Sequence, residues 1–369
     1  MTTGRLIKAA VLREPGQPLT VEELVLAAPG PGEVEVRIAA SGICHSDVFY
    51  FNGAWEGARP AVYGHEGAGV VVAVGPGVAG VTPGQRALVT LVRSCGTCFF
   101  CDHEQPALCD TSFPLDAPGP LSTKGGEPVL HGFRTAAFAE RVVVHESQVV
   151  PIPNELPYDS ASLLACGVLT GFGAVTKTAG VEAGAHVVVI GAGGVGLNSI
   201  QASAIAGAAS TVAVDLDASK LEVALAFGAT QAFSPNNGDV RDAVLALTDG
   251  RGADYVFVTV GSVSAMESGM ELLRRGGELV VVGMTPTGSI ASYDPTTLAH
   301  DSRSILGSKM GSSVPAIDVP AFAALYTEGR LKLDELISGR YPLEQINEAV
   351  ASTASGSALR NVIVFDIDE

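Results

Sequence analysis

The sequence predicts an α/β protein with two domains, one rich in β-strands and one built on a parallel sheet flanked by helices. Two observations carry this prediction. Short β-branched segments separated by glycine and proline turns fill the first half, and apolar strands alternate with helix-length segments from about residue 171. At about 100–200 residues per domain, 369 residues are enough for two or three domains with sizeable cores.

The individual elements follow from apolar runs and from the turns that bound them. In the first half the β-branched segments 33–39 (EVEVRIA) and 68–74 (AGVVVAV) are expected to be strands. Later elements are expected as strands at 187–190, 211–214, 255–260 and 278–283, a helix at 343–351 and a closing strand at 361–366. We therefore expect an α/β domain at 167–306, inserted between two parts of the β-rich domain, 1–166 and 307–369.

Composition excludes several classes of protein. With 22 basic and 39 acidic residues the formal charge is −17, which would repel a phosphate backbone, so nucleic acid is not expected as a partner. No secretory signal is visible at the start of the chain, which predicts a cytoplasmic protein. The longest apolar stretch, 186–209, contains four polar residues between Asn198 and Ser203 and is better explained as a buried strand and helix than as a membrane span.

A glycine-rich segment predicts a dinucleotide site. The sequence GAGGVG follows the strand HVVVI and opens a helix-like run, and Asp215 ends the next strand. The residues concerned are Gly191, Gly193, Gly194, Val195, Gly196 and Asp215. Helix N-terminal amides would bind the pyrophosphate, and the Asp215 carboxylate would accept hydrogen bonds from a ribose but repel a 2′-phosphate. This favours NAD over NADP, the alternative being a tight strand-to-helix turn without a ligand.

Four of the six cysteines form a closely spaced group, Cys95, Cys98, Cys101 and Cys109. In a chain without a visible secretory signal, such a group favours a metal site over disulfides. Four thiolates with no open position would hold a structural zinc. An iron–sulfur cluster is the competing interpretation, although the last spacing and the absence of a following proline depart from the ferredoxin pattern.

The remaining cysteines, Cys44 and Cys166, are isolated, and each alone could be a core residue. Cys44 lies in GICHSD, and His65 follows in a glycine-bounded segment, YGHEG. Together the two thiolates and the imidazole would form the Cys₂His set of a catalytic zinc with an open fourth position. Such a metal lowers the pKa of a bound oxygen, as the oxidation of an alcohol requires.

These motifs together resemble the zinc-dependent medium-chain alcohol dehydrogenases, over nearly the whole chain from GICHSD through GHEGAG, LLACGVLTGFG and GAGGVG to LRNVIVF. The resemblance implies a GroES-like catalytic domain that carries both zinc sites, a Rossmann coenzyme domain, and a homodimer or homotetramer. It also implies NAD-dependent oxidoreductase activity on a small-molecule alcohol or aldehyde. The long segment 110–135, between the cysteine group and the next strand, resembles the longer-chain subgroup, which includes the glutathione-dependent formaldehyde dehydrogenases.

The resemblance also assigns roles to single residues. Cys44, His65 and Cys166 match the catalytic zinc ligands. The other matching positions are Glu66 near the metal, Asp47 behind the ligand histidine, Ser46 as acceptor of the alcohol proton, Thr170 beside the nicotinamide, and Lys220 and Arg360 facing the coenzyme, although Lys220 could also be an ordinary solvated lysine. His45 stands where many relatives have an arginine against the pyrophosphate. Phe49 replaces the histidine that ends a proton relay, so proton release needs another route, through Tyr50 or solvent.

Four positions match the substrate pocket of the family, and each could alternatively be a core residue: Trp55, Leu91, Phe133 and Met284. An apolar, partly aromatic lining favours a benzylic, allylic or medium-chain alcohol. Two alternatives stay open, a glutathione- or mycothiol-dependent formaldehyde dehydrogenase and a non-enzymatic interaction protein that binds zinc and a nucleotide.

Overall fold

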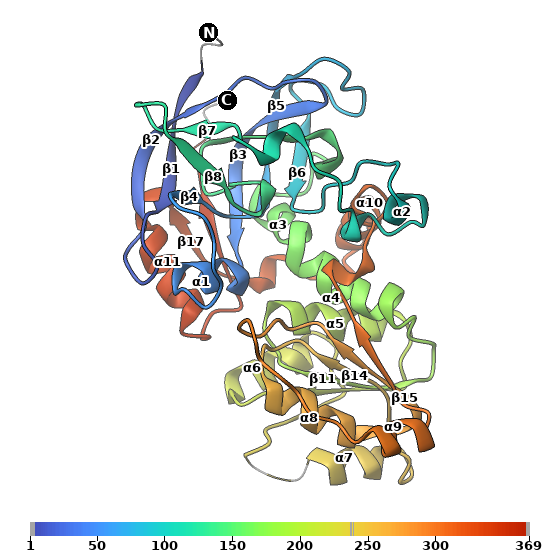
Figure 1. Ribbon diagram of the computed structural model, residues 1–369. Coiled ribbons are helices and arrows are strands. Elements are labelled where there is room, and N and C mark those ends of the chain that lie inside the picture. The colour runs from blue at the N-terminus through green and yellow to red at the C-terminus, as the bar shows by residue number, and fades with distance from the viewer. Residues whose placement is uncertain (1–3, 237, 239, 367–369) are drawn as a thin grey trace. The chain divides into compact units, whose positions relative to one another are not determined.

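The structure, a computed structural model, describes residues 4–236, 238 and 240–366. The chain forms two compact units, Met1–Cys166 with Val314–Glu369 and Gly167–Ser313 (Figure 1). The second unit thus continues to Ser313, beyond the end expected at residue 306.

The first unit is built from a closed barrel and a seven-stranded sheet. The barrel strands, in order, are β1 (Arg5–Leu12), β2 (Thr20–Leu26), β7 (Leu121–Ser122), β8 (Pro128–His131) and β4 (Ala61–Val62). The sheet runs β10 (Val149–Pro151), β6 (Arg86–Thr90), β5 (Glu66–Val74), β3 (Glu33–Ile43), β18 (Arg360–Val364) and β17 (Ile337–Pro342), and β9 (Arg141–His145) also pairs with β3. The expected β-rich domain is confirmed. The segment 110–135, expected to precede the next strand, itself contains β7 and β8, because these short strands close the barrel.

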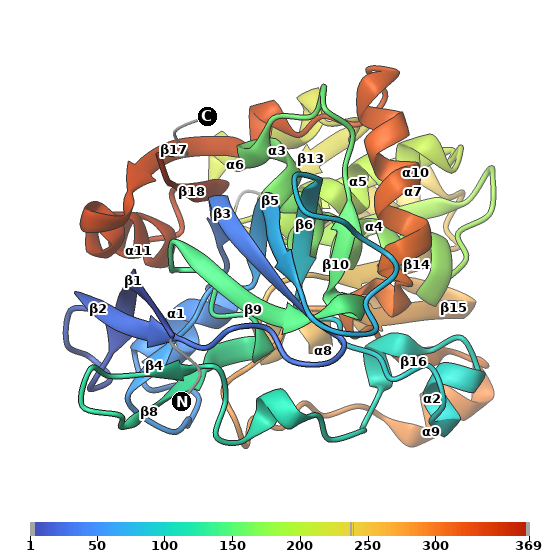
Figure 2. The same cartoon turned by 90° about the horizontal axis from the view of Figure 1, so that it is seen from above.

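Strand β3 organises the first unit. Its sequence EVEVRIAASGI is buried on both faces except at Arg37, and β5, β9 and β18 all pair with it (Figure 2). Val34, Val36 and Ile38 pack into one apolar cluster with residues of β5, β6 and β9. The register sets Gly42 opposite Glu66 and Ile43 opposite Asn361. The end of β3 therefore meets the beginnings of β5 and β18.

The second unit is a six-stranded sheet whose strand pairs are all parallel, with helices in the crossovers. The sheet order is β13 (Gln231–Phe233), β12 (Ser210–Val214), β11 (His186–Ile190), β14 (Ala253–Val258), β15 (Leu273–Val281) and β16 (Ser304–Gly307). Its α-helices include α5 (Gly194–Ile205), α6 (Ala218–Ala226), α7 (Val240–Leu247), α8 (Val263–Leu272) and α9 (Pro295–His300). The strand order reverses between β11 and β14, and ligands bind at such a switch point in open α/β sheets. The expected doubly wound domain is confirmed.

The other α-helices are α1 (His45–Phe51), α2 (Phe99–Asp102), α3 (Tyr158–Leu163), α4 (Leu169–Gly173), α10 (Pro315–Thr327) and α11 (Ile346–Ala354). Within the described residues one helical run, Tyr158–Thr178, is long and apolar enough to cross a membrane, and 89% of its most apolar window is buried inside the protein. The stretch 186–209, which the sequence analysis assigned to a buried strand and helix, forms β11 and α5.

Candidate active site

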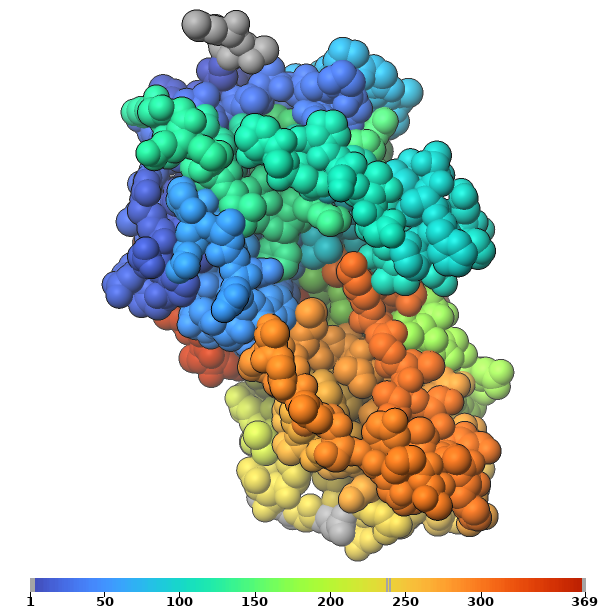
Figure 3. Space-filling view, in the orientation of Figure 1, coloured from blue at the N-terminus to red at the C-terminus, as the bar shows by residue number. Residues whose placement is uncertain are grey.

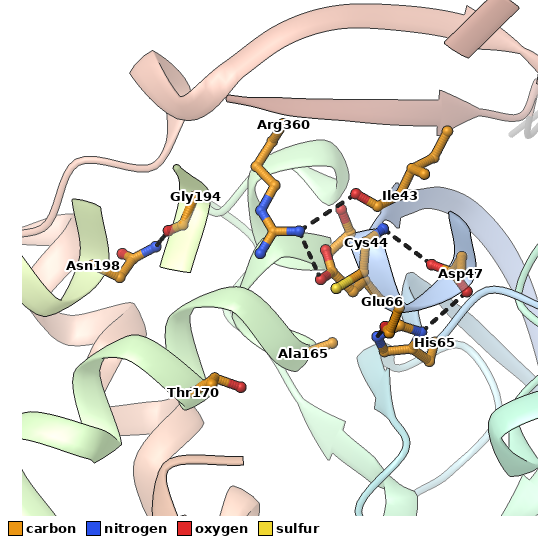
Figure 4. Close-up of polar contacts among 12 residues, drawn as sticks. Ile43, Cys44, Asp47, His65, Glu66, Ala165, Thr170, Gly194, Asn198 and Arg360 are labelled. Carbon is orange, nitrogen blue, oxygen red and sulfur yellow. Dashed lines mark hydrogen bonds and ion pairs between the residues drawn. The ribbon is translucent and has the colours of Figure 1, made fainter. Parts of the chain in front are cut away.

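The first part of the site lies where β3 ends and α1 begins. Cys44 is the residue before α1, and its backbone N–H donates to Asp47 Oδ2 at 3.0 Å. Asp47 Oδ1 accepts from the Gly64 N–H at 3.1 Å and lies 3.3 Å from His65 Nδ1 (Figure 4). Asp47 and His65 are fully buried. One carboxylate thus orients the imidazole and leaves Nε2 for a ligand.

Cys166 reaches the same place from the long helical run. It lies in a π-helical turn, Leu164–Val168, and π-turns within helices are frequent at functional sites. The Thr90 hydroxyl at the end of β6 donates to the Ala165 carbonyl at 2.7 Å. This bond fixes the turn next to the cysteine, and no sequence signal marked Thr90 for that role.

The ligand atoms of Cys44, His65, Glu66 and Cys166 lie within 4.8 Å of one another. Two thiolates and an imidazole are the donor types of a catalytic zinc site with three protein ligands. Glu66 is fully buried, and among the described residues its Oε2 has no hydrogen-bond partner. A buried, unpaired carboxylate oxygen beside three metal-type ligands fits a divalent cation.

Burial and neighbouring charges shift the pKa values of this group. The hydrogen bond from Cys166 is the main cause that lowers the pKa of Cys44, and His65 and Arg360 add to it. Burial alone would lower the pKa of His65, but the charge and hydrogen bond of Asp47 outweigh it, so that pKa is raised. Burial raises the pKa of Glu66 to about 7, although the charge of Arg360 opposes the change.

Arg360 lies within this group. It is 6% exposed, and its Nη1 lies 3.2 Å from Glu66 Oε1 and 3.4 Å from the Ile43 carbonyl (Figure 4). The family resemblance implies that Arg360 faces the coenzyme. The structure shows its pairing with Glu66, which the sequence did not indicate because the two residues are far apart in the chain.

Three further residues of α1 were matched to roles in the site, and their surroundings differ. Ser46 Oγ lies 3.5 Å from His65 Nε2, whereas His45 is exposed. The Phe49 ring packs edge-on against Trp55, with the ring centroids 5.0 Å apart. A phenyl ring neither donates nor accepts a proton, so Phe49 cannot act as a relay group.

One of the matched pocket residues, Phe133, contacts a metal ligand, with its ring centroid 4.4 Å from that of His65. The ring of Tyr50 contacts both Trp55 and Phe133 and therefore lies between them. Leu91 directly follows β6. Met284 belongs to the second unit and is 63% exposed.

The other four cysteines form a second group in the first unit. Their sulfur atoms lie within 4.8 Å of one another, with Cys95 and Cys101 separated by 4.0 Å and Cys98 and Cys109 by 3.8 Å. Four sulfurs at about 2.3 Å from one ion in a tetrahedron are about 3.8 Å apart, so the group fits a single zinc ion. Thiolates of an iron–sulfur cluster bind different irons, which this tight grouping does not favour.

The glycine motif lies at the start of α5, next to the end of β12. Gly191 has a φ of 99°, and a Cβ on Gly196 would lie 1.7 Å from the Gly191 carbonyl oxygen. A Cβ on Gly193 would meet nothing within 4 Å, so the backbone there borders open space. Asp215 accepts hydrogen bonds from the Ala192 N–H at 2.7 Å and from the Asp217 N–H at 2.9 Å. The open backbone at a helix N-terminus fits a pyrophosphate.

Two further residues matched to the coenzyme also lie in the second unit. The Thr170 hydroxyl is 3.7 Å from Met310 Sδ, and Lys220 is a half-buried residue of α6. The roles of Thr170 and Lys220 at the coenzyme stay predictions.

Comparison with known proteins agrees with this geometry. Two family models match, the alcohol dehydrogenase GroES-like domain over residues 30–154 and the zinc-binding dehydrogenase over residues 194–328. An NDMA-dependent alcohol dehydrogenase of Amycolatopsis methanolica is 36% identical over 98% of this chain and 99% of its own. A class-3 alcohol dehydrogenase of Cereibacter sphaeroides is 38% identical, over 97% and 99%. An S-(hydroxymethyl)glutathione dehydrogenase of Paracoccus denitrificans is 36% identical, over 97% and 99%.

Two solved structures share the fold. A zinc-binding-domain alcohol dehydrogenase protein of Burkholderia ambifaria has a TM-score of 0.94 and 36% identity, with 98% of this chain and 100% of the other covered. Benzyl alcohol dehydrogenase of Acinetobacter calcoaceticus has a TM-score of 0.91 and 29% identity over the same shares. The fold and the two ligand groups therefore define an oxidoreductase. The chain belongs to the zinc-dependent medium-chain alcohol dehydrogenase family.

Proposed function

We propose that this protein is an NAD-dependent alcohol dehydrogenase that interconverts an apolar benzylic, allylic or medium-chain alcohol and its aldehyde or ketone. The observation that carries the proposal is the convergence of Cys44, His65 and Cys166 within 4.8 Å, in a pattern that leaves a zinc ion one open position. The apolar substrate class is supported by the Phe133 ring against His65 and by the aromatic cluster around Trp55.

When bound, zinc lowers the pKa of the alcohol hydroxyl and NAD accepts the hydride. The protein's own residues do the rest. Asp47 holds His65 in the tautomer that presents Nε2, and Ser46, beside that nitrogen, relays the hydroxyl proton by taking it up as it releases its own. Because Phe49 cannot carry the proton further, we propose that it leaves through solvent or through Tyr50. Arg360 holds Glu66 beside the ligands.

Coenzyme selection is assigned to Asp215. Its carboxylate is held at the glycine loop by two backbone N–H groups, at the position that contacts the adenosine ribose in such folds. A 2′-phosphate there would meet a fixed negative charge, so NAD is preferred over NADP. The binding of pyrophosphate is assigned to the backbone of Gly193 and Gly194, supported by open space at Gly193.

The chain's assembly and location belong to the same proposal. A homodimer or homotetramer in the cytoplasm is proposed from the resemblance to the family. A second candidate function is thiol-dependent formaldehyde dehydrogenase, which the 36% identity to an S-(hydroxymethyl)glutathione dehydrogenase favours.

The test is steady-state kinetics of the zinc-loaded protein with benzyl alcohol, cinnamyl alcohol and 1-octanol, each with NAD and with NADP. We expect turnover with NAD, weaker turnover with NADP, and a shift toward NADP in Asp215→Gly. The exposed Asp294→Asn, in the same unit, is the charge-matched control. Turnover only of formaldehyde with glutathione or mycothiol would support the second candidate, and preference of the unmodified protein for NADP would refute the role of Asp215.

A further inference from the structure

Two fully buried polar residues of the first unit, Thr90 and Gln148, are hydrogen-bonded to each other. Thr90 ends β6, and Gln148 ends a 3₁₀ turn, Glu146–Gln148, that leads into β10. The Gln148 Nε2 donates to the Thr90 carbonyl at 3.0 Å, and its Oε1 accepts from the His145 N–H at 3.3 Å. Because both ends of the amide are hydrogen-bonded within the protein, the side chain of Gln148 has one fixed orientation.

Thr90 borders two of the elements that bring the metal-type ligands together. In the ladder between β5 and β6 it lies opposite Glu66. Its hydroxyl donates to the Ala165 carbonyl at 2.7 Å, one residue before Cys166 in the π-helical turn. The regular hydrogen-bond ladder of an α-helix is interrupted in a π-turn. A bond from outside the helix therefore helps to fix where this turn, and with it the Cys166 sulfur, lies.

The second hydrogen of the Gln148 amide is used to hold a strained turn. Nε2 also donates to the Arg134 carbonyl at 3.0 Å. Phe133, Arg134 and Ala136 have φ values of 52°, 63° and 52°, in the left-handed region that residues with a side chain seldom adopt. Such residues persist where the surrounding structure holds them, and they are concentrated at functional sites. Loss of the Gln148 amide would remove one of the contacts that hold this turn.

The strained turn places an aromatic ring against a metal-type ligand. The Phe133 ring centroid lies 4.4 Å from that of His65 and meets the Tyr50 ring edge-on at 5.3 Å. In Figure 3 the blue-green surface of the segment around residues 115–134 borders the blue surface of the segment around residues 50–57, and Arg134 is exposed. The turn thus connects the protein surface to the ligand histidine, and the position of the Phe133 ring depends on how the turn is held.

We propose that Thr90 and Gln148 are a linked pair of positioning residues, Thr90 for the zinc ligand Cys166 and Gln148 for the Phe133 ring that determines substrate specificity. Both act through other residues, by hydrogen bonds to the backbone carbonyls of Ala165 and Arg134. The bond between them joins the metal ligand and the pocket wall through one buried contact. The specificity role rests on the alcohol dehydrogenase function proposed above, whereas the role at the metal site does not.

Zinc release tests the role of Thr90 without turnover. The zinc-loaded protein is mixed with a chelator, and the release phase that is absent in Cys44→Ala belongs to the site of Cys44, His65 and Cys166. We expect this phase to be about tenfold faster in Thr90→Val, which keeps the shape of the side chain but lacks the hydroxyl. Thr90→Ser, which keeps the hydroxyl, should restore the original rate, and the phase of the four-cysteine group should not change.

Thr248→Val is the matched control for a general loss of stability. Thr248 is 1% exposed, and its hydroxyl donates to the Val244 carbonyl at 2.8 Å in the second unit. This variant should leave both release phases unchanged, although it loses the same kind of buried hydrogen bond. Equal release rates in Thr90→Val and the unmodified protein, or no recovery in Thr90→Ser, would overturn the role of Thr90.

Substrate selectivity tests the role of Gln148. The ratio of kcat/KM for benzyl alcohol to kcat/KM for ethanol cancels changes in folding or in metal content, and ethanol has no ring to pack against Phe133. We expect this ratio to fall about fivefold or more in Gln148→Met, whose side chain has a similar length but no donor. Gln201→Met, at a buried glutamine of the second unit whose Nε2 donates to Asn198 Oδ1 at 3.3 Å, is the matched control. In a Phe133→Leu background, Gln148→Met should change the ratio no further.

Hydrogen exchange tests Gln148 without a substrate. Backbone amides of the segment 132–138 should exchange faster in Gln148→Met than in Gln201→Met, because the turn has lost one of its contacts. Unchanged exchange in this segment, or an unchanged substrate ratio in an active Gln148→Met protein, would overturn the role of Gln148. If the unmodified protein oxidises neither alcohol while zinc release and hydrogen exchange change as expected, the proposed function fails and the positioning roles stand.

Discussion

His131 shows how one buried side chain makes the folding stability depend on pH. Its imidazole is 8% exposed, and burial lowers its pKa to about 4, against about 6.5 in an unfolded chain. Between these two values the unfolded chain binds a proton that the folded chain does not. The stability that the neutral imidazole confers is therefore complete above pH 6.5 and is lost as the pH falls toward 4.

We predict that the free energy of unfolding falls less steeply on acidification in His131→Leu than in the unmodified protein. Between pH 6 and 4.5 the two slopes of this free energy against pH should differ by up to about 1.4 kcal/mol per pH unit, the value for one proton. Denaturant unfolding of both proteins with excess zinc measures it, since metal loss at low pH affects both alike. Parallel curves for the two proteins would contradict the assignment.

At the scale of elements, two glycines in the turn from β11 into α5 are needed for different reasons, Gly196 for packing and Gly193 for coenzyme binding. A Cβ at position 196 would lie 1.7 Å from the Gly191 carbonyl oxygen, so any side chain there forces the helix away from the strand. A Cβ at position 193 would meet nothing, and Gly193 has a φ of −79°, which alanine adopts without strain.

We therefore predict opposite outcomes for two alanine substitutions. Gly196→Ala should destabilise the protein by roughly 2 kcal/mol or more, through steric overlap with backbone. Gly193→Ala should change stability by less than about 0.5 kcal/mol but weaken NADH binding tenfold or more, because its methyl group occupies the space assigned to the pyrophosphate. Thermal unfolding and NADH fluorescence titration separate the effects. Unchanged NADH affinity in Gly193→Ala would show that the coenzyme does not approach this backbone.

The elements that the sequence predicted best are those with local signals. Apolar runs between turns located β3, β5, β11 and β12, and the strand–glycine–helix pattern located the start of α5. The short barrel strands β7 and β8 were missed because a two- to four-residue strand has too few residues for a periodic pattern.

Within the site, spacing alone grouped the four cysteines from Cys95 to Cys109. Cys44, His65 and Cys166 were grouped by their donor types and not by spacing, because only the packing of β3, β5 and the π-helical turn brings them together. The pairing of Arg360 with Glu66, and the burial of His131, depend on contacts that no local pattern encodes.

At the scale of the whole molecule, both ligand groups lie in the first unit, and all six cysteines precede residue 167. The two ligand groups differ in how firmly the chain around them is packed. Cys44, His65 and Cys166 are attached to buried strands and to the helical run. Between Cys95 and Thr111, only Ala107 and Cys109 are buried, so this segment has almost no apolar core. A metal must supply the stability that a core would provide.

This contrast predicts two zinc ions per chain with different effects on removal. Cys44→Ala should lose one zinc and nearly all turnover but keep its melting temperature within a few degrees, since the surrounding elements stay packed. Cys98→Ala should lose the other zinc and melt lower by more than about 5 °C, because the segment around it loses its main attachment. Elemental analysis and calorimetry measure both, with NADH binding by the second unit as the check that each variant is folded. Two zinc ions retained in Cys98→Ala, or equal melting temperatures for the two variants, would show that the four-cysteine segment is held by something other than metal.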